Sequence, residues 1–297
     1  MPSAATLRTA TVLALAAAAT MMTTTVLAAC NGEDALCDRL YSNVTFVGSH
    51  DSAFVGKLLA DNQLISVADQ LALGVRFLQA QTHDKDGTIE MCHTSCLELD
   101  AGSLADYLAP VKTFMDANPD EVVTLLLTNG DGIAVADYAD VFSAAGLEEY
   151  VFTPSGTLAL DGWPTLQTMI DNGTRLVVWM DYNADTSSVP YILDEFSYYF
   201  ETHYDVTDSS FPDCSIDRPS GASGDGRMGI VNHMLHLEIL GIQIPDELSA
   251  DTTNSVDSIS AQAAICEGLY GRDPNVVLLD YVNLGDAMGA QAALNGL

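Results

Sequence analysis

The sequence predicts an α/β fold, namely an irregular TIM-type (β/α)8 barrel in a single domain of residues 30–297. Short apolar runs alternate with amphipathic segments along the chain, which is the order of strand and helix in a barrel. About eight such runs fall within the length of one domain, and polar residues follow most of them. The alternative is a doubly wound open sheet, but no Gly-rich phosphate loop follows the first run.

Residues 1–29 precede this domain and have the pattern of a secretory signal peptide. Arg8 is their one charged residue, residues 13–20 are apolar and rich in Ala, and residues 26–28 offer small side chains at the spacing of a cleavage site. A buried helix is the alternative interpretation, but the run has neither helix caps nor a polar face. We therefore predict a secreted, extracellular protein.

The first half of the domain contains four predicted strands, at residues 44–47, 75–80, 88–92 and 122–127. Helical spacing of apolar residues predicts one helix over residues 63–73, which Gly74 ends, and another over residues 103–118, which Pro119 ends. The link between the second and third strands is too short for a helix. We therefore expect these two strands to pair as a hairpin, which makes the barrel irregular.

The second half of the domain continues the alternation. Helices are predicted over residues 134–145, 163–170 and 261–270. Strands are predicted over residues 176–180, 198–200, 229–231 and 276–279. Residues 205–226 are rich in Ser, Asp, Gly and Pro, so they predict a long surface loop that Cys214 holds in place.

The six cysteines of a secreted chain predict three disulfides, although six cysteines allow fifteen pairings. A zinc site is the rival interpretation, and it is weaker because the cysteines are scattered along the chain. The simplest pairing joins neighbours in the sequence, namely Cys30–Cys37, Cys92–Cys96 and, by elimination, Cys214–Cys266.

The composition argues against several kinds of partner. The formal net charge is −31, and it becomes −32 without the signal peptide, whose one charge is an arginine. Such acidity argues against nucleic acid or an anionic membrane as a standing partner. Hydrophobic residues make up 48% of the chain, but we expect neither a membrane span nor a C-terminal lipid anchor. We expect a monomer that is glycosylated at the sequons of Asn43 and Asn172.

Polar side chains follow the carboxyl ends of nearly all predicted strands, the end that carries the chemistry in α/β barrels. Gln79 and Gln81 alternate along one strand, so both amides are expected to point into one pocket. One polar residue at a strand end means little, but recurrence at successive strand ends predicts a site. The remaining members of this set are His50, Asp51, His93, Thr128, Asn129, Asp181, Asn232, His233, Asp280 and Asn283.

Two histidines of this set suffice for acid–base chemistry. His50 follows the first strand, and His93 lies between Cys92 and Cys96. Imidazole is the side chain whose ordinary pKa lies closest to neutral pH. If the two strands are neighbours in one barrel, these side chains face each other across a pocket as general base and general acid.

The motifs around these residues resemble the X-region of phosphatidylinositol-specific phospholipase C. The resemblance rests on GSHDS at 48–52, GVRFL at 74–78, NPDEVV at 118–123 and DYVN at 280–283. A secreted branch of phospholipase C-like phosphodiesterases, common among fungi, is similar in QAQTH at 79–83, CHTSC at 92–96 and WMDY at 179–182. The motifs occur in order over nearly all of the mature chain.

This resemblance implies a barrel in which two histidines cleave a phosphodiester by acid–base catalysis. His50 would take the proton of an attacking hydroxyl, from inositol or from water, and His93 would protonate the leaving alcohol. Asp280 matches the carboxylate that orients the first histidine, and Asp51 matches the one that supports the second. The implied substrate is a phospholipid headgroup or a glycerophosphodiester.

The sequence departs from the family pattern at its second strand. Bacterial members carry an arginine there that meets the phosphate charge, and animal members carry acids that bind calcium. Here Gln79 and Gln81 are neutral, and Thr128 falls where animal enzymes place another acidic calcium ligand. The usual calcium ligands are therefore replaced, so no cofactor is predicted and the metal requirement stays open.

Three functions remain open at this point. The two histidines and their carboxylates favour a secreted phosphodiesterase. The neutral glutamines favour a barrel that retains a ligand pocket without turnover, because electrostatic stabilisation is often the largest catalytic effect. The third is an enzyme on a cationic headgroup such as choline, with a cation–π contact to a tyrosine. The residues predicted to bind substrate are Gln79, Gln81, Asn129, Asp181, Tyr182 and His233.

Overall fold

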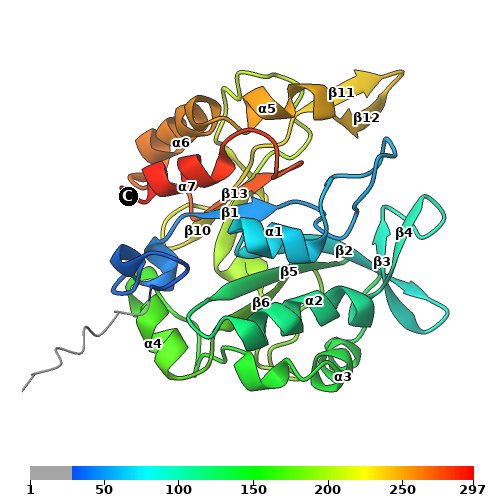
Figure 1. Cartoon of the computed structure of the whole chain (residues 1–297), viewed down its shortest axis with the longest axis vertical. Coiled ribbons are helices and arrows are strands. Elements are labelled where there is room, and N and C mark those ends of the chain that lie inside the picture. Colours follow the sequence, from blue (N-terminus) through cyan, green and yellow to red (C-terminus); the bar gives the residue numbers. More distant parts are fainter. Residues whose placement is uncertain (1–28) are drawn as a thin grey trace, which may run out of the picture.

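The structure of the protein, a computed structural model, describes residues 29–297. The signal peptide predicted for residues 1–29 therefore lies outside the described residues except for its last position. Eight parallel strands frame the fold (Figure 1): β1 (Phe46–Ser49), β2 (Phe77–Lys85), β5 (Val123–Asn129), β6 (Leu176–Met180), β7 (Ile192–Asp194), β8 (Tyr199–Thr202), β10 (Met228–Asn232) and β13 (Val276–Leu279).

These strands form a curled sheet with the order β7–β6–β5–β2–β1–β13–β10–β8, in which every neighbouring pair is parallel. The two ends of this path, β7 and β8, are consecutive in the chain. No ladder joins them within residues 29–297, so the barrel is open at one seam. The predicted α/β fold with an irregular TIM-type barrel is confirmed.

Helices cover the outer face of this sheet (Figure 1). Gly74 ends the first helix with a φ of 118°, and the Ser103 hydroxyl caps the second by accepting from the Asp106 amide. The α-helices of the described residues are α1 (Val67–Leu73), α2 (Leu104–Ala117), α3 (Val135–Ala144), α4 (Leu166–Asp171), α5 (Ala250–Thr253), α6 (Val256–Tyr270) and α7 (Ala287–Leu294). Short 3₁₀ helices are η1 (Asp34–Leu36), η2 (Tyr41–Asn43), η3 (Glu148–Tyr150), η4 (Leu160–Gly162), η5 (Glu195–Ser197) and η6 (Glu247–Ser249).

Side chains alternate across each barrel strand between two apolar cores. Leu125 and Leu127 pack outward in the cluster that contains α1, α2 and α3, whereas Leu126 faces inward. Trp179 and Tyr199 lie in the inward cluster with ring centroids 5.1 Å apart, and the N-terminal segment contributes residues to the same cluster. The interior of the barrel is therefore filled by side chains up to the level where the polar residues begin.

The crowding of this interior explains Gly48 in β1. A Cβ at this position would lie 2.8 Å from Leu278 Cδ1 and 3.0 Å from Val276 Cγ1. Both contacts are shorter than a van der Waals separation allows, so the barrel has no room for a side chain there.

The third predicted strand is real, but it does not belong to the barrel. It is β3 (Thr88–His93), which pairs antiparallel with β2 and with β4 (Leu99–Ser103), so the expected hairpin is confirmed. The barrel strand absent from the sequence prediction is β7, which has only three residues. The segments β9 (Ile216–Arg218), β11 (His236–Ile239), β12 (Ile242–Pro245) and α7 were also not predicted.

The predicted disulfides are confirmed in all three pairings: Cys30–Cys37, Cys92–Cys96 and Cys214–Cys266. The third joins the segment between β8 and β10 to α6. That segment was predicted as a surface loop, yet it contains β9, which pairs with β8. Asn43 and Asn172 are exposed, and their glycosylation stays a prediction.

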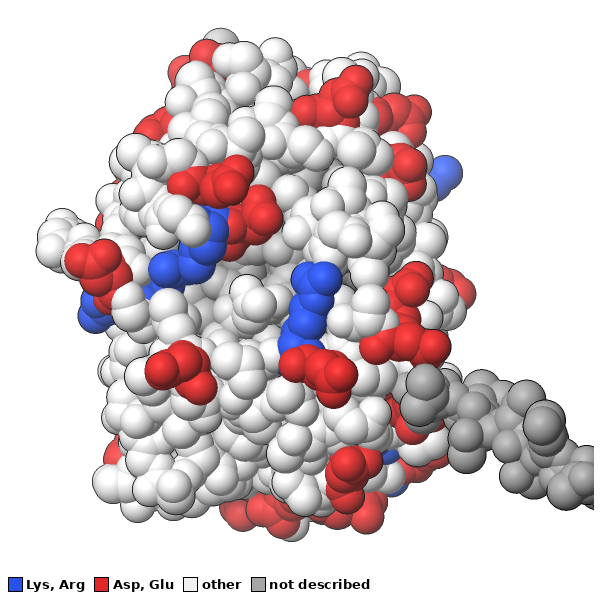
Figure 2. All heavy atoms as spheres, turned by 90° about the vertical axis from the view of Figure 1, so that its left-hand side faces the viewer, with Lys and Arg blue, Asp and Glu red and all other residues white. Residues whose placement is uncertain are grey.

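The described residues contain no helix that is both long and apolar enough to cross a membrane. Figure 2 shows the side of the molecule that lies on the left in Figure 1, with acidic side chains scattered over it and few basic ones. On this face the negative charge of the sequence is therefore spread rather than gathered in one patch.

Candidate active site

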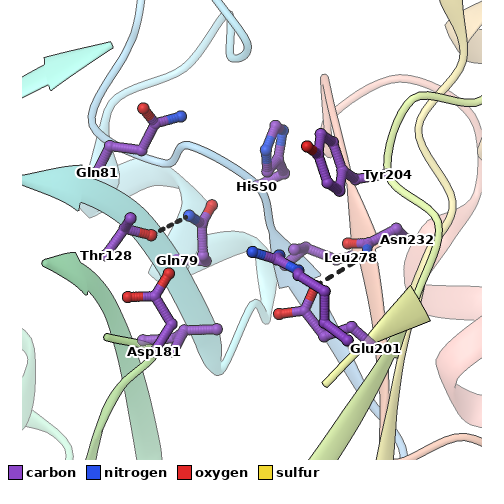
Figure 3. Close-up of a pocket in the computed structure, with 11 residues that line it drawn as sticks. His50, Gln79, Gln81, Thr128, Asp181, Glu201, Tyr204, Asn232 and Leu278 are labelled. Carbon is purple, nitrogen blue, oxygen red and sulfur yellow. Dashed lines mark hydrogen bonds and ion pairs between the residues drawn. The ribbon is translucent and has the colours of Figure 1, made fainter. Parts of the chain in front are cut away.

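A cavity of about 210 Å³ opens at the carboxyl ends of the barrel strands (Figure 3). On β5 it is lined by Leu126 and Thr128, and on β2 by Gln79 and Gln81, which share a face as predicted. These are inward-facing positions, so the cavity continues the interior of the barrel. The other lining residues are His50, Asp181, Glu201, Tyr204, Arg218, Asn232 and Leu278.

His50 is held by a carboxylate on the neighbouring strand. Its Nδ1 lies 2.8 Å from Asp280 Oδ1, and Asn62 Nδ2 donates to the same oxygen at 2.9 Å. In the pairing of β1 with β13, Ser49 lies opposite Leu279, which places the next two residues, His50 and Asp280, side by side. This geometry fixes the imidazole orientation, which is the role the resemblance implied for Asp280.

Asp51 lies between the two histidines. Its Oδ2 is 3.5 Å from His50 Nε2 and 3.3 Å from His93 Nε2, and the Asp51 side chain is fully buried. Gln81 Nε2 donates to the same oxygen at 2.9 Å. The structure thus brings together His50, Asp51, His93 and Asp280, as the sequence predicted.

The backbone bends sharply at each part of this cluster. Asp51, Thr94 and Tyr281 have positive φ angles of 44°, 60° and 50°, and they directly follow His50, His93 and Asp280. Non-glycine residues rarely adopt this conformation, and those that do are often found at functional sites. The three turns therefore mark the place where the chain is shaped to present these side chains.

The charges of this cluster shift its pKa values. Burial alone lowers the pKa of His50, but the charges of Asp51 and Asp280 outweigh burial and raise it to about 9. Burial also lowers the pKa of His93, yet the hydrogen bond and charge of Asp51 raise it above the ordinary value. Burial raises the pKa of Asp51, but the two imidazoles outweigh burial and lower it. With a pKa of about 9, His50 is therefore mostly protonated at neutral pH, and Asp51 favours the charged form of both imidazoles.

The two glutamines hold the backbone beside His50 and His93 in place. Gln79 Oε1 accepts from the Asp51 amide at 2.7 Å, and Gln81 Oε1 accepts from the Thr94 amide at 3.0 Å. Each amide oxygen is therefore already committed to a backbone N–H beside a catalytic candidate. Such neutral, occupied oxygens do not fit calcium, which takes six to eight oxygen ligands including carboxylates. Among the described residues, no group of three or more His, Cys, Asp or Glu is placed to hold a metal ion.

Asp181 faces the cavity opposite His50 (Figure 3). Its Oδ1 accepts from the Tyr182 amide at 2.7 Å and from the Asn129 amide at 3.1 Å. Burial raises the pKa of the Asp181 carboxyl to about 6. Tyr182 itself is 40% exposed, and its hydroxyl accepts from Arg218 Nη1 at 3.1 Å, so this side chain lies beside the cavity without lining it.

Besides Tyr182, two more of the residues predicted to bind substrate do not line the cavity. Asn129 Nδ2 donates to the Ile133 carbonyl at 2.9 Å, so this side chain closes a turn. His233 is fully buried, with Nδ1 2.5 Å from Gln262 Oε1 and its ring stacked on Phe211. The reason is strand alternation, because the residues that face the cavity are their neighbours Thr128 and Asn232.

Glu201, Tyr204 and Arg218 line the cavity but were not among the predicted site residues. Glu201 directly follows the predicted strand at 198–200, so the strand-end signal that found the other residues also applies to it. Arg218 lies in the segment predicted as a loop, and no local pattern indicated that it reaches the barrel. Its contact with the site arises from the pairing of β8 with β9.

A family model described as PI-PLC X 1 matches residues 36–295 of this chain. The chain belongs to the PI-PLC X family. A relative from Arthroderma benhamiae, named PI-PLC X domain-containing protein 1, is 52% identical over 273 residues, which cover 90% of each chain. A second relative from the same fungus, named an uncharacterized secreted protein, is 43% identical over 88% of this chain and 62% of its own length.

Solved structures agree with this family at the level of the fold. The phosphatidylinositol-specific phospholipase C of Listeria monocytogenes superposes with a TM-score of 0.57 at 13% identity, covering 88% of this PI-PLC X chain and 95% of the other. A mutant of the Staphylococcus aureus enzyme of that name gives a TM-score of 0.58 at 14% identity, with 87% and 93% covered. At such low identity these likenesses show the fold alone.

Proposed function

We propose that this PI-PLC X chain is a secreted phosphodiesterase that cleaves a phospholipid headgroup or a glycerophosphodiester. The observation that carries the proposal is the chain of side chains Asp280–His50–Asp51–His93 at the mouth of a barrel cavity. It supplies two imidazoles in different carboxylate settings, which is the arrangement that acid–base catalysis requires. The predicted signal peptide, the three disulfides and the name of the second fungal relative support secretion.

In the proposed reaction His50 is the general base. Its Nδ1 is held by Asp280, and in the fraction of molecules in which the ring is neutral, Nε2 takes the proton of the attacking hydroxyl. The oxygen of that hydroxyl forms a bond to phosphorus while the bond to the leaving alcohol breaks. The Asp51–His93 pair returns a proton to the leaving oxygen, and the Asp51 carboxylate favours the protonated form of His93 that this role requires.

The test is phosphorus NMR of the purified protein with phosphatidylinositol, phosphatidylcholine and glycerophosphodiesters. We expect a new phosphorus signal with the wild type and none with His50→Ala, because the base is removed. His203→Ala is the matched control, since His203 is exposed and does not line the cavity. Because the glutamines do not fit calcium, we expect the same rate with calcium and with a chelator.

Two results would contradict the proposal. Turnover that survives in His50→Ala removes His50 from the reaction. The absence of product from the wild type under every condition favours the second candidate function, a barrel that binds its ligand without turnover. The observation that favours this second candidate is that Gln79 and Gln81 bring no charge to the cavity.

A further inference from the structure

We propose that Arg218 binds the phosphoryl anion in this cavity and replaces the cation that the second strand lacks. The proposal rests on the proposed function, since it assumes that a phosphodiester enters the cavity. Among the eleven lining residues, all within residues 29–297, Arg218 is the one Lys or Arg. Arginine suits this task because its guanidinium is always charged and its fork of N–H donors matches phosphate oxygens.

Arg218 reaches the cavity because of strand register. In the antiparallel pair of β8 and β9, Arg218 lies directly opposite Glu201. Its Nη2 donates to Glu201 Oε2 at 2.5 Å, so the ion pair is built into the ladder. The segment that carries Arg218 is also tied to α6 by the disulfide Cys214–Cys266.

The guanidinium is held on several sides. Tyr182 accepts from Nη1 at 3.1 Å, and the ring centroids of Tyr204 and Phe196 lie 5.2 Å and 5.8 Å from the guanidinium carbon. Glu201 is itself fixed, because it is buried and accepts from Asn232 Nδ2 at 3.0 Å. A donor that is already oriented costs no reorganisation when an anion binds, which is what electrostatic stabilisation requires.

Arg218 keeps donors for a ligand after these contacts. A guanidinium has five N–H groups, and the bonds to Glu201 and Tyr182 use two of them. Three remain: the one on Nε is buried, and the other two, on Nη1 and Nη2, can donate to a ligand. Glu201 therefore orients Arg218 and leaves some of its N–H donors free for a ligand.

The negative charge of Glu201 opposes the binding of an anion by Arg218, because it offsets the charge of the guanidinium. Glu195 is buried beside Glu201, and burial together with the charge of Glu201 raises the pKa of Glu195 well above its usual range. Among the described residues, Glu201 is the carboxylate that forms an ion pair with Arg218. Glu201→Gln removes this opposing charge but keeps a side-chain oxygen that can accept from Arg218, so we expect it to strengthen anion binding.

The experiment is calorimetric titration of the full-length mature chain with inorganic phosphate at pH 7. We expect Arg218→Gln with Glu201→Gln, a double variant that leaves no unpaired buried charge, to weaken phosphate binding about 10- to 100-fold. Glu201→Gln alone is expected to bind phosphate more tightly than the wild type. Arg227→Gln is the matched control, because Arg227 lies in the same segment, bonds only to backbone carbonyls and does not line the cavity.

The outcomes separate this inference from the proposed function. Phosphate binding that depends on Arg218 supports the inference even if no substrate is turned over, in which case the proposed function fails. Turnover that depends on His50 with equal phosphate binding in the wild type and the double variant overturns the inference while the proposed function stands. A wild type that binds no phosphate also overturns the inference. A Glu201→Gln variant that binds phosphate more weakly than the wild type but more tightly than the double variant supports it, and shows that Glu201 acts mainly by orienting Arg218.

Discussion

At the scale of single residues, Asp51 is the group on which the site depends. One oxygen of this carboxylate faces both imidazoles, at 3.5 Å from His50 and 3.3 Å from His93. The protonation of each histidine therefore depends on the same negative charge, so the pair titrates as a coupled unit. The backbone of Asp51 is fixed as well, because its amide donates to Gln79 Oε1 at 2.7 Å.

The residue-scale prediction is that Asp51→Asn moves the pH dependence of catalysis to lower pH. His50 must be neutral to accept a proton, and with a pKa of about 9 it becomes neutral only as the pH rises toward that value. In the wild type we therefore expect kcat/KM to rise with pH up to about 9. Loss of the Asp51 charge lowers the pKa of His50, so the rising limb should shift down by about one unit or more.

Two measurements check this shift. The first is the pH profile of kcat/KM, in which the position of the limb is read rather than its height, because Asp51→Asn also weakens the Asp51–His93 pair. The second is an NMR titration of the His50 ring, which needs no turnover. An unchanged His50 pKa in the variant would refute the assignment of Asp51 as its main charge partner.

Single residues also show how much of the site could be predicted from the sequence. His50, Asp51, His93 and Asp280 could be found because each lies in a distinctive motif at the end of an apolar run. Asn129 and His233 were chosen one position away from the residues that face the cavity. A strand end shows that polar residues are near the mouth, but only the register of the strand decides which of two neighbours points inward.

At the scale of elements, the β2–β3 hairpin brings the second histidine to the site. The second strand has nine residues and runs beyond the parallel part of the barrel, and β3 returns antiparallel to it. His93 at the end of β3 therefore approaches Asp51 from the hairpin and not from the next barrel strand. The disulfide Cys92–Cys96 and the bond from Thr94 to Gln81 fix this return.

The sequence predicted this hairpin because the link between its strands is short, which is a local property. It did not predict β7, because three residues carry too little periodicity, and it did not predict that Arg218 reaches the cavity. The position of Arg218 depends on its pairing with Glu201, seventeen residues earlier in the chain. A contact that depends on how two separate strands pair leaves no pattern in the sequence of either strand.

The element-scale prediction concerns Gly48 in β1. Gly48→Ala forces a methyl group against Leu278 and Val276 in the filled interior, so we expect the free energy of unfolding to fall by about 1–3 kcal/mol. Gly268→Ala is the control with the opposite sign. Gly268 lies in α6 with no atom within 4 Å of a built Cβ, so alanine should stabilise the helix by up to about 1 kcal/mol.

Urea unfolding followed by circular dichroism measures both changes. Equal stability of Gly48→Ala and the wild type would show that β1 and β13 can move apart without cost. Such a result would also weaken the argument that these two strands hold His50 and Asp280 in a fixed geometry.

At the scale of the whole molecule, the inner face of the barrel contributes both an apolar core and the lining of the candidate site. The apolar interior fills the N-terminal part of each strand, and the same face becomes polar at the carboxyl ends. Cations in the cavity, His50 and Arg218, therefore sit in a molecule whose net charge is strongly negative. The carboxylates beside these two cations hold them there, while the remaining acids are spread over the surface, as on the face in Figure 2.

The last prediction follows from this charge distribution. Many like charges on one surface repel each other and oppose the compact state, and salt screens that repulsion over a Debye length of about 10 Å at 0.1 M. We therefore expect sodium chloride to raise the Tm at pH 7.5, because the formal net charge of the sequence is −31 near neutral pH. Close to the isoelectric point of about 4.1 the net charge vanishes, so the same salt should raise the Tm little or not at all.

Thermal scans with increasing salt at both pH values measure this difference. A Tm that rises equally at both would show that salt acts through hydration and not through surface repulsion. A Tm that falls with salt at pH 7.5 would show that the ion pairs around His50, Asp51 and Arg218 dominate stability over the repulsion of the surface acids.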